Sequence, residues 1–340
     1  MEADVLVTFL LNLVGVLPLE MALTFGLALF ALSWLVPRRL VSLPQIGRRR
    51  STLLWAATAG SVLMIVVASV TSGITASTWD SSGYDGWLRR PLPLLVATLV
   101  VAIAGFALRR TPLPAPNERA IAPRRSWRAF TPQPLLWIAG IVAAVIVVVA
   151  LWQISIAVSA PRSGPFFGQV PDYTSLPIYM SFNGLGYVPG AGWPNHLATL
   201  LALVVAGVVL VVSLRAEANR PLAGRSTAPS VTADRESTAR LLVLILLAGL
   251  ITTLGAVLMH VGTSGMSAVG LDEQWVSEDT SITKLNITGG YSAIAGRMNL
   301  TGYVVQGAGV ALALRIAVDA LRGARRPAPA AASETMGATR

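Results

Sequence analysis

The sequence predicts an all-α integral membrane protein with about seven transmembrane helices, arranged as one N-terminal span followed by three outward hairpins. Of its 340 residues, 54% are hydrophobic and only 12% are charged, which is more apolar surface than a soluble core of this size buries. The apolar residues are grouped in runs of roughly 20, the length of helix that crosses the hydrocarbon of a bilayer. Backbone polar groups in lipid must bond within their own segment, so these runs are expected to be helices and not strands.

Seven apolar runs define the expected spans, which together form one transmembrane domain over residues 18–322. The spans lie near residues 18–36, 52–74, 91–108, 134–157, 195–214, 241–262 and 301–321. A six-span chain results if the third run, which begins with Pro91 and Pro93, does not insert. An eight-span chain results if the N-terminal stretch inserts as a span of its own. Residues 323–340 are expected to form a disordered tail.

The first apolar run extends from Val5 to Val36 and holds Pro18 and Glu20 near its middle. A single helix over this run would be about 48 Å long, too long for an average bilayer without steep tilt. Proline favours the first position of a helix, so we expect the first span to begin at Pro18 and residues 1–17 to lie along the outer interface or re-enter the membrane. Glu20 then lies in the first turn, where a carboxylate complements the helix dipole. The alternative is a functional acid inside the membrane.

Basic residues predict the orientation of the chain. Twenty Lys or Arg residues lie in the stretches 37–51, 109–133, 214–240 and 322–340, against five in the alternating stretches 75–90, 158–194 and 263–300. Basic residues are retained on the cytoplasmic side, so the N-terminus is expected outside and the C-terminus in the cytoplasm. Lys284 is the single lysine, and this preference for arginine, with abundant alanine and valine, indicates a GC-rich bacterial genome and hence a bacterial plasma membrane.

The formal net charge of +10 is explained by this topology. Arginine clusters at the membrane edge meet anionic headgroups, so the lipid bilayer is the expected partner and nucleic acid is not, because no recognition fold has room to form. The chain has no cysteine, which excludes disulfides, thiol catalysis and iron–sulfur clusters. No cofactor is expected.

The loops predicted to lie outside contain most of the candidate binding residues. The second and third of these loops are long, and loops of that length are usually structured or functional. Their aromatic and acidic side chains form either an interfacial belt with solvating acids or an extracytoplasmic recognition surface on a rigid scaffold. The candidate ligand-binding residues are Trp79, Asp80, Asp85, Trp87, Asp172, Tyr173, Asp272, Glu273 and Trp275.

Further polar side chains are predicted at or within the spans. His196 and His260 fall near the outer ends of spans five and six. With an acid such as Asp272 they offer metal ligands, but they are far apart in sequence and lack the HExxH spacing. Ordinary interfacial hydrogen bonds are the favoured interpretation. Arg315 and Asp319 stand four residues apart on one helical face. They either couple to protons or ions or neutralise each other near the cytoplasmic end. No metal site is predicted.

Three classes of function fit these observations. The first is a non-enzymatic subunit, permease-like or accessory, of a transport or cell-envelope assembly that includes other membrane or cytoplasmic proteins, with an ATPase as one candidate. Residues 118–130 could supply a docking helix. The second is a seven-helix sensor that signals through a separate cytoplasmic partner. The third is an enzyme acting on a lipid-linked or glycan substrate through an outer-loop acid such as Asp80, Asp85 or Asp272. The first is favoured, because the helices contain no catalytic pattern.

Overall fold

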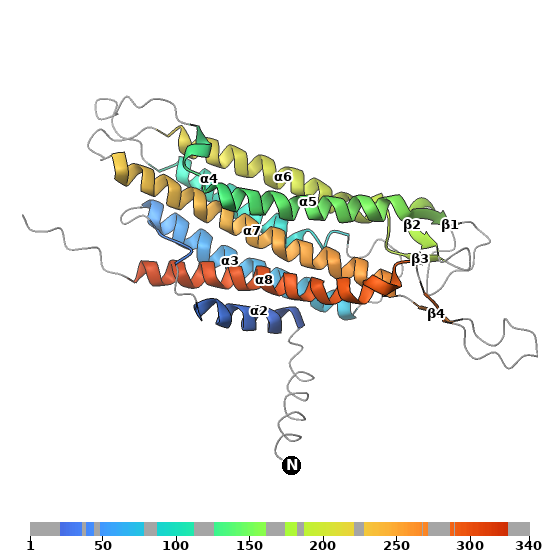
Figure 1. The fold of residues 1–340 in the computed structure, drawn as a ribbon. Helices are drawn as coiled ribbons and strands as arrows, with labels where there is room; N and C mark the ends of the chain where they lie inside the picture. Colours follow the sequence, from blue (N-terminus) through green and yellow to red (C-terminus); the bar gives the residue numbers. More distant parts are fainter. Residues whose placement is uncertain are drawn as a thin grey trace, which may run out of the picture.

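The structure is a computed structural model whose helices lie side by side in an elongated bundle (Figure 1). It describes the backbone of residues 21–35, 39–43, 48–77, 87–111, 126–160, 174–181, 187–220, 228–266, 268–270, 286–288 and 290–325. The predicted N-terminal segment 1–17, the acid Glu20 and most of the predicted tail lie outside these described residues.

Helices make up most of the described chain. The α-helices are α2 (Met21–Leu32), α3 (Arg48–Ser77), α4 (Leu92–Arg109), α5 (Gln133–Ile156), α6 (Trp193–Ala218), α7 (Ala228–Met266) and α8 (Ser292–Ala324). Two 3-10 turns, η1 (Ser33–Leu35) and η3 (Trp127–Ala129), complete them. A docking helix was considered for residues 118–130. Of these, residues 126–130 are described, and they form only the short turn η3.

Six helices, α3 to α8, are long and apolar enough to cross a membrane, as expected of an all-α membrane protein. They coincide with the second to seventh predicted spans. The first predicted span is described only over Met21–Leu35, a shorter apolar helix. Helices α7 and α8 extend beyond their predicted spans, because hydropathy detects the part that fits hydrocarbon and not the polar turns that continue the helix outside it.

Short strands occur where the sequence predicted only loops. Strands β1 (Ala157–Ala160), β2 (Thr174–Ser181) and β3 (Tyr187–Pro189) form an antiparallel sheet between α5 and α6. Strands β4 (Ala268–Gly270) and β5 (Asn286–Thr288) pair between α7 and α8. These segments are too short for hydropathy to identify, and they add two small sheets to the helical fold.

Helix α7 is the centre of the bundle. In its most apolar stretch 83% of residues are buried, against 17% in α5, and α7 packs on α3, α4, α5, α6 and α8. The outer helices turn large apolar side chains outward, among them Trp55, Trp137 and Val204. An apolar exterior of this kind is suited to contact with lipid.

Glycines allow α7 and α8 to approach closely. A Cβ atom at Gly302 would lie 2.6 Å from both the backbone nitrogen and Cγ of Met259, and one at Gly309 would lie 2.7 Å from the backbone nitrogen of Thr252. Small residues at such positions are typical of helix pairs in membranes. The contact fixes the long central pair of the bundle.

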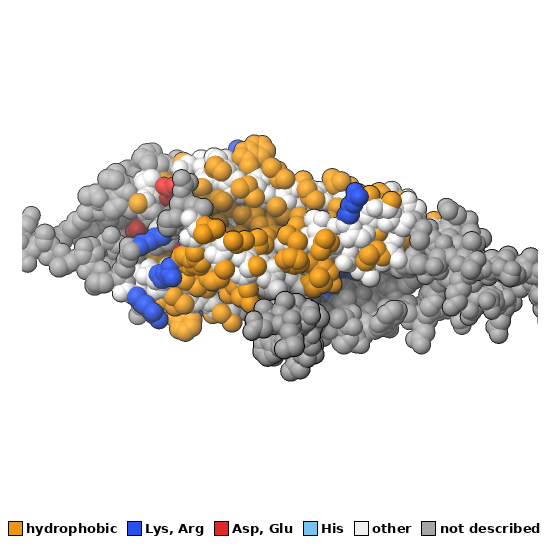
Figure 2. All heavy atoms as spheres, turned by 60° about the horizontal axis from the view of Figure 1, so that its bottom comes forward, with side chains coloured by type: hydrophobic (Ala, Val, Ile, Leu, Met, Phe, Trp, Pro, Cys, Tyr) orange, Lys and Arg blue, Asp and Glu red, His pale blue; other side chains and the backbone are white. Residues whose placement is uncertain are grey.

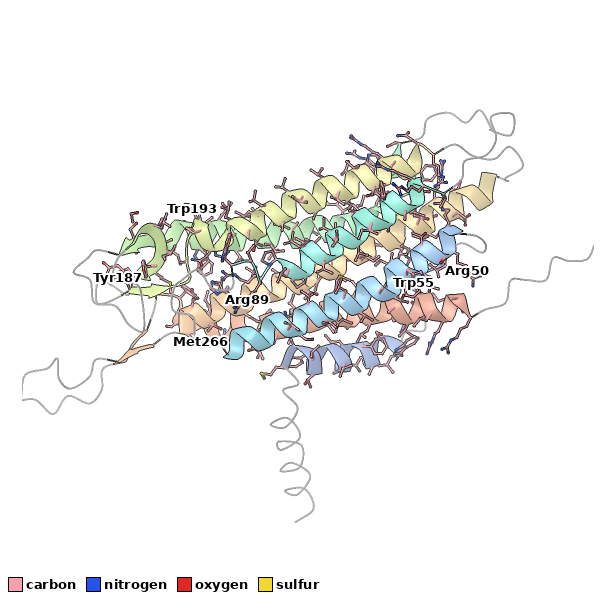
Figure 3. All side chains as sticks on the ribbon, turned by 180° about the vertical axis from the view of Figure 1, so that it is seen from behind. Arg50, Trp55, Arg89, Tyr187, Trp193 and Met266 are labelled. Carbon is pink, nitrogen blue, oxygen red and sulfur yellow. The ribbon has the colours of Figure 1, made fainter. Side chains whose placement is uncertain are left out.

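The two ends of the bundle differ in chemistry. We call the end that carries the strands the strand end, and the opposite end, where α4 and α6 finish and α3 and α7 begin, the arginine end (Figure 1). Figure 2 shows apolar side chains along the middle of one face and most of its visible basic side chains toward the arginine end. Figure 3 shows Arg89, Tyr187, Trp193 and Met266 around the strand end and Arg50 near the other.

Candidate functional site

The described chain contains four of the predicted site residues: Trp87, His260, Arg315 and Asp319. Trp87 precedes α4 at the strand end and is 36% exposed, and His260 lies there on α7, whereas Arg315 and Asp319 lie near the arginine end of α8. The remaining candidates lie outside the described residues: Glu20, Trp79, Asp80, Asp85, Asp172, Tyr173, Asp272, Glu273 and Trp275.

Buried polar side chains converge at the strand end, beneath the β1–β2–β3 sheet. They come from the turn before α4, the first turns of α6 and the last part of α7. We call this group the histidine cluster, and its members are Arg90, Asn195, His196, Thr199 and His260. The ring centroids of the two histidines are 6.3 Å apart, although the residues are distant in sequence.

Two glycines with positive φ connect the sheet to α6. Gly190 has φ +122° and Gly192 has φ +97°, a region that residues with a Cβ rarely adopt. A Cβ at Gly192 would collide with the carbonyl oxygen of Pro177, and one at Gly190 would lie 3.3 Å from Cε1 of His260. Pro194 then occupies the first turn of α6, where proline is favoured. The connection therefore holds the sheet directly over the beginning of α6.

His260 is fixed by one of these glycines. Its Nε2 lies 2.8 Å from the carbonyl oxygen of Gly190. A carbonyl only accepts hydrogen bonds, so Nε2 carries the proton and, in the neutral ring, Nδ1 is left as an acceptor. The side chain of His260 thus has the ordinary hydrogen bond that the sequence analysis favoured.

His196 is in a different situation. Its ring is fully buried, and neither nitrogen has a hydrogen-bond partner within the described chain. The same holds for the amide oxygen of Asn195 and the hydroxyl of Thr199, although the Asn195 amide nitrogen donates to the carbonyl oxygen of Ala191 at 2.7 Å. A buried polar group without a partner costs about 1–3 kcal/mol. Three such groups on the first two turns of α6 make this cluster the candidate binding site.

Arg90 brings a permanent positive charge to this group. Its side chain is 7% exposed, and Nη2 donates to the carbonyl oxygen of Asn195 at 3.2 Å. A guanidinium among imidazoles attracts an anion and repels a cation, and the effect is strong where water is excluded. The described chain contains no group of three His, Cys, Asp or Glu residues that could hold a metal ion. The chemistry of the histidine cluster therefore suits an anionic or hydrogen-bonding group better than a metal.

A second polar contact lies on the neighbouring side of α7. Gln153 of α5 is fully buried, and its Nε2 lies 3.5 Å from the Tyr291 hydroxyl, which donates to the carbonyl oxygen of Val261. The Tyr291 ring also packs edge-on against Trp152 at 4.9 Å between centroids, and burial raises the pKa of its hydroxyl. These contacts join α5, α7 and the start of α8 just behind the cluster.

Arg315 and Asp319 form the pair expected from their spacing, with Arg315 Nε 3.5 Å from Asp319 Oδ1. Both are buried, and the pair also holds the first helix, because Arg315 lies 3.4 Å from the Trp34 ring centroid and donates to Ser33. Asp319 Oδ2 accepts from the backbone N–H of Leu40 at 2.8 Å. Through these contacts the pair holds α8 against the segment that follows α2, and we call it the clamp.

Sequence reasoning missed most of the histidine cluster. It placed His196 and His260 near the outer ends of spans five and six and favoured ordinary interfacial hydrogen bonds for both, but it did not consider Arg90, Asn195 or Thr199 as site residues. The positions of the two histidines at the outer ends of consecutive spans put them at one level of the bundle, but no pattern in the sequence added the other three residues. Comparison of the chain with protein-family models, with curated proteins and with solved structures found no match.

Proposed function

We propose that the chain is a non-enzymatic polytopic membrane protein, a permease-like or accessory subunit of a transport or cell-envelope assembly, that recognises an anionic group at its strand end. The observation that carries this proposal is the fully buried His196, whose ring nitrogens have no partner in the described chain, beside the Arg90 guanidinium. A rigid helical scaffold with a polar site at one end is suited to binding.

The proposed topology has seven spans, with the N-terminus outside, the C-terminus in the cytoplasm and the protein in a bacterial plasma membrane. The concentration of arginine at one end of the bundle supports this orientation, since basic residues are retained in the cytoplasm. The strand end then faces the outside, and the histidine cluster meets ligands or partners from the extracytoplasmic side.

The subunit proposal is tested by purifying the tagged protein from its native membrane in mild detergent and identifying co-purifying chains by mass spectrometry. A stoichiometric permease or ATPase is expected. A stoichiometric kinase or transcriptional regulator would instead support a sensor, and a protein that emerges alone would remove the subunit proposal.

The recognition proposal is tested by native mass spectrometry of the same preparation. We expect a bound small molecule in the wild-type protein and its loss in His196→Leu. Thr253→Val is the matched control, because Thr253 is also fully buried with an unpartnered hydroxyl but lies away from the cluster in α7. The same bound mass in all three proteins, or in none, would overturn the assignment of the cluster as a binding site.

A further inference from the structure

A cavity of about 240 Å³ lies at the arginine end, which is the opposite end of the bundle from the histidine cluster. It opens between the end of α4 and the end of α6, with Leu242 of α7 behind it. The polar lining residues are Arg109, Ser213, Glu217, Asn219 and Arg220. The cavity therefore combines an apolar back wall with charged groups where two membrane-length helices end.

The one acidic residue in the lining is already engaged. Glu217 is 7% exposed and forms an ion pair with Arg49 of α3, whose Nη2 also donates to Thr238 of α7 at 3.2 Å. This pair neutralises the carboxylate and joins three helices. The charges of Arg109 and Arg220 then give the cavity a positive potential.

Arg220 is held in a fixed position beside the cavity. It donates to the carbonyl oxygens of Leu108 and, at 2.8 Å, of Thr111, so it caps the end of α4. Burial lowers the pKa of its guanidinium, and nearby Arg49 lowers it further, while Glu217 raises it. An anion in the cavity would offset both unfavourable effects.

Arg109 is the more adjustable of the two cations. Its side chain is exposed, and its one hydrogen bond within the described chain is a long one, 3.3 Å from Nη2 to the carbonyl oxygen of Val212. A guanidinium in this position can turn toward an anion without breaking a strong contact.

Ser213 adds a hydroxyl group to the lining of the cavity. Its side chain is only 7% exposed, and it lies on α6 among the lining residues. Gly105 of α4 lies directly against this side chain, since a Cβ at Gly105 would lie 2.8 Å from Ser213 Oγ. The glycine thus leaves the hydroxyl accessible from the cavity.

We propose that this cavity binds a phosphate group, held by Arg109, Arg220 and the hydroxyl of Ser213. Guanidinium forks and a hydroxyl are the donors that phosphate oxygens prefer. The phosphate belongs either to a phospholipid headgroup or to free inorganic phosphate. The position at the ends of α4 and α6 and the apolar wall of Leu108 and Leu242 favour the phospholipid.

The test measures ligand binding to the protein purified in detergent and compares variants of two adjacent arginines, Arg109 and Arg110. Phosphatidylglycerol, inorganic phosphate and diacylglycerol, which has acyl chains but no phosphate, are titrated while thermal stability and bound mass are recorded. We expect saturable binding of phosphatidylglycerol and none of diacylglycerol. Arg109→Gln should weaken this binding roughly tenfold.

Arg110→Gln is the matched control, because Arg110 lies over the Phe106 ring at 4.4 Å and does not line the cavity. It should change binding by less than about twofold. If inorganic phosphate shows the Arg109 dependence and phosphatidylglycerol does not, the site is one for free phosphate. Equal weakening by both substitutions, or by neither, would overturn the proposal in favour of unspecific attraction to headgroups.

A second pair of variants covers the case in which Arg109→Gln does not fold. Gly105→Ala places a methyl group against Ser213 and should weaken phosphate binding, whereas Gly207→Ala on α6 meets no atom within 4 Å and should leave it unchanged. Unchanged binding in Gly105→Ala would also overturn the proposal.

Discussion

At the scale of single residues, the histidine cluster holds several polar atoms that are buried without a partner in the described chain. Thr199 and Thr98 are both buried threonines on membrane-length helices, yet only Thr98 has its hydroxyl bonded, to the carbonyl oxygen of Leu94 at 2.7 Å. The difference between them isolates the cost of the unpartnered group.

Thr199→Val removes an unpartnered hydroxyl and should raise the free energy of unfolding of the ligand-free protein by roughly 1 kcal/mol. Thr98→Val breaks a bond and should lower it by about the same amount. Unfolding in mixed micelles measures both. If the two substitutions have equal effects, the Thr199 hydroxyl is satisfied and the histidine cluster loses one of its supports.

The clamp around Arg315 makes a second prediction at this scale. Arg315→Leu leaves the buried Asp319 carboxylate without its cation and should cost about 3–5 kcal/mol of stability. Adding Asp319→Leu should recover part of this loss, because the stranded charge is then gone.

Arg322→Leu serves as the control for this clamp, since Arg322 contributes another cation to the Trp34 ring, 3.9 Å from its centroid. It should cost roughly 0.5–2 kcal/mol. A double variant no more stable than Arg315→Leu alone would contradict the account of a mutually neutralising pair.

At the scale of elements, the α7–α8 contact depends on glycines that have no room for a side chain. Gly302→Ala pushes a methyl group into Met259 and should destabilise the protein by about 1–3 kcal/mol. Gly140→Ala, where no atom lies within 4 Å, should instead stabilise it by up to about 1 kcal/mol through helix propensity. Thermal unfolding of the two variants checks this; similar shifts in one direction would show that the contact is not close.

The helices were predictable from sequence, but the strands were not. A membrane-length helix requires about 20 consecutive apolar residues, and this signal identified all six of the long helices from α3 to α8. Strands such as Tyr187–Pro189 have three residues and carry no comparable pattern. The helix ends differed because a helix such as Ala228–Met266 continues beyond the apolar residues that identify it.

The pair Arg315 and Asp319 was predictable because both residues lie on one helix, where spacing alone decides their proximity. The histidine cluster was not, because its members come from three segments and meet only when the helices pack. The space beside Ser213 depends in the same way on how α4 and α6 pack, so no local pattern indicates it.

For the whole molecule, the separation of the two ends is the main feature. One end combines the sheets with the histidine cluster, and the other combines the arginines with the cavity between α4 and α6. In the proposed topology the first end lies outside and the second in the cytoplasm, so each proposed ligand would reach its site from a different side of the membrane.

The most direct test of this arrangement uses single cysteines, since the chain has none of its own. Gly290→Cys and Arg325→Cys place one thiol beside each end of α8, and both positions are exposed. With a membrane-impermeant maleimide, Gly290→Cys should be labelled in intact cells and Arg325→Cys only after permeabilisation. Labelling of both in intact cells, or the reverse order, would contradict the proposed orientation.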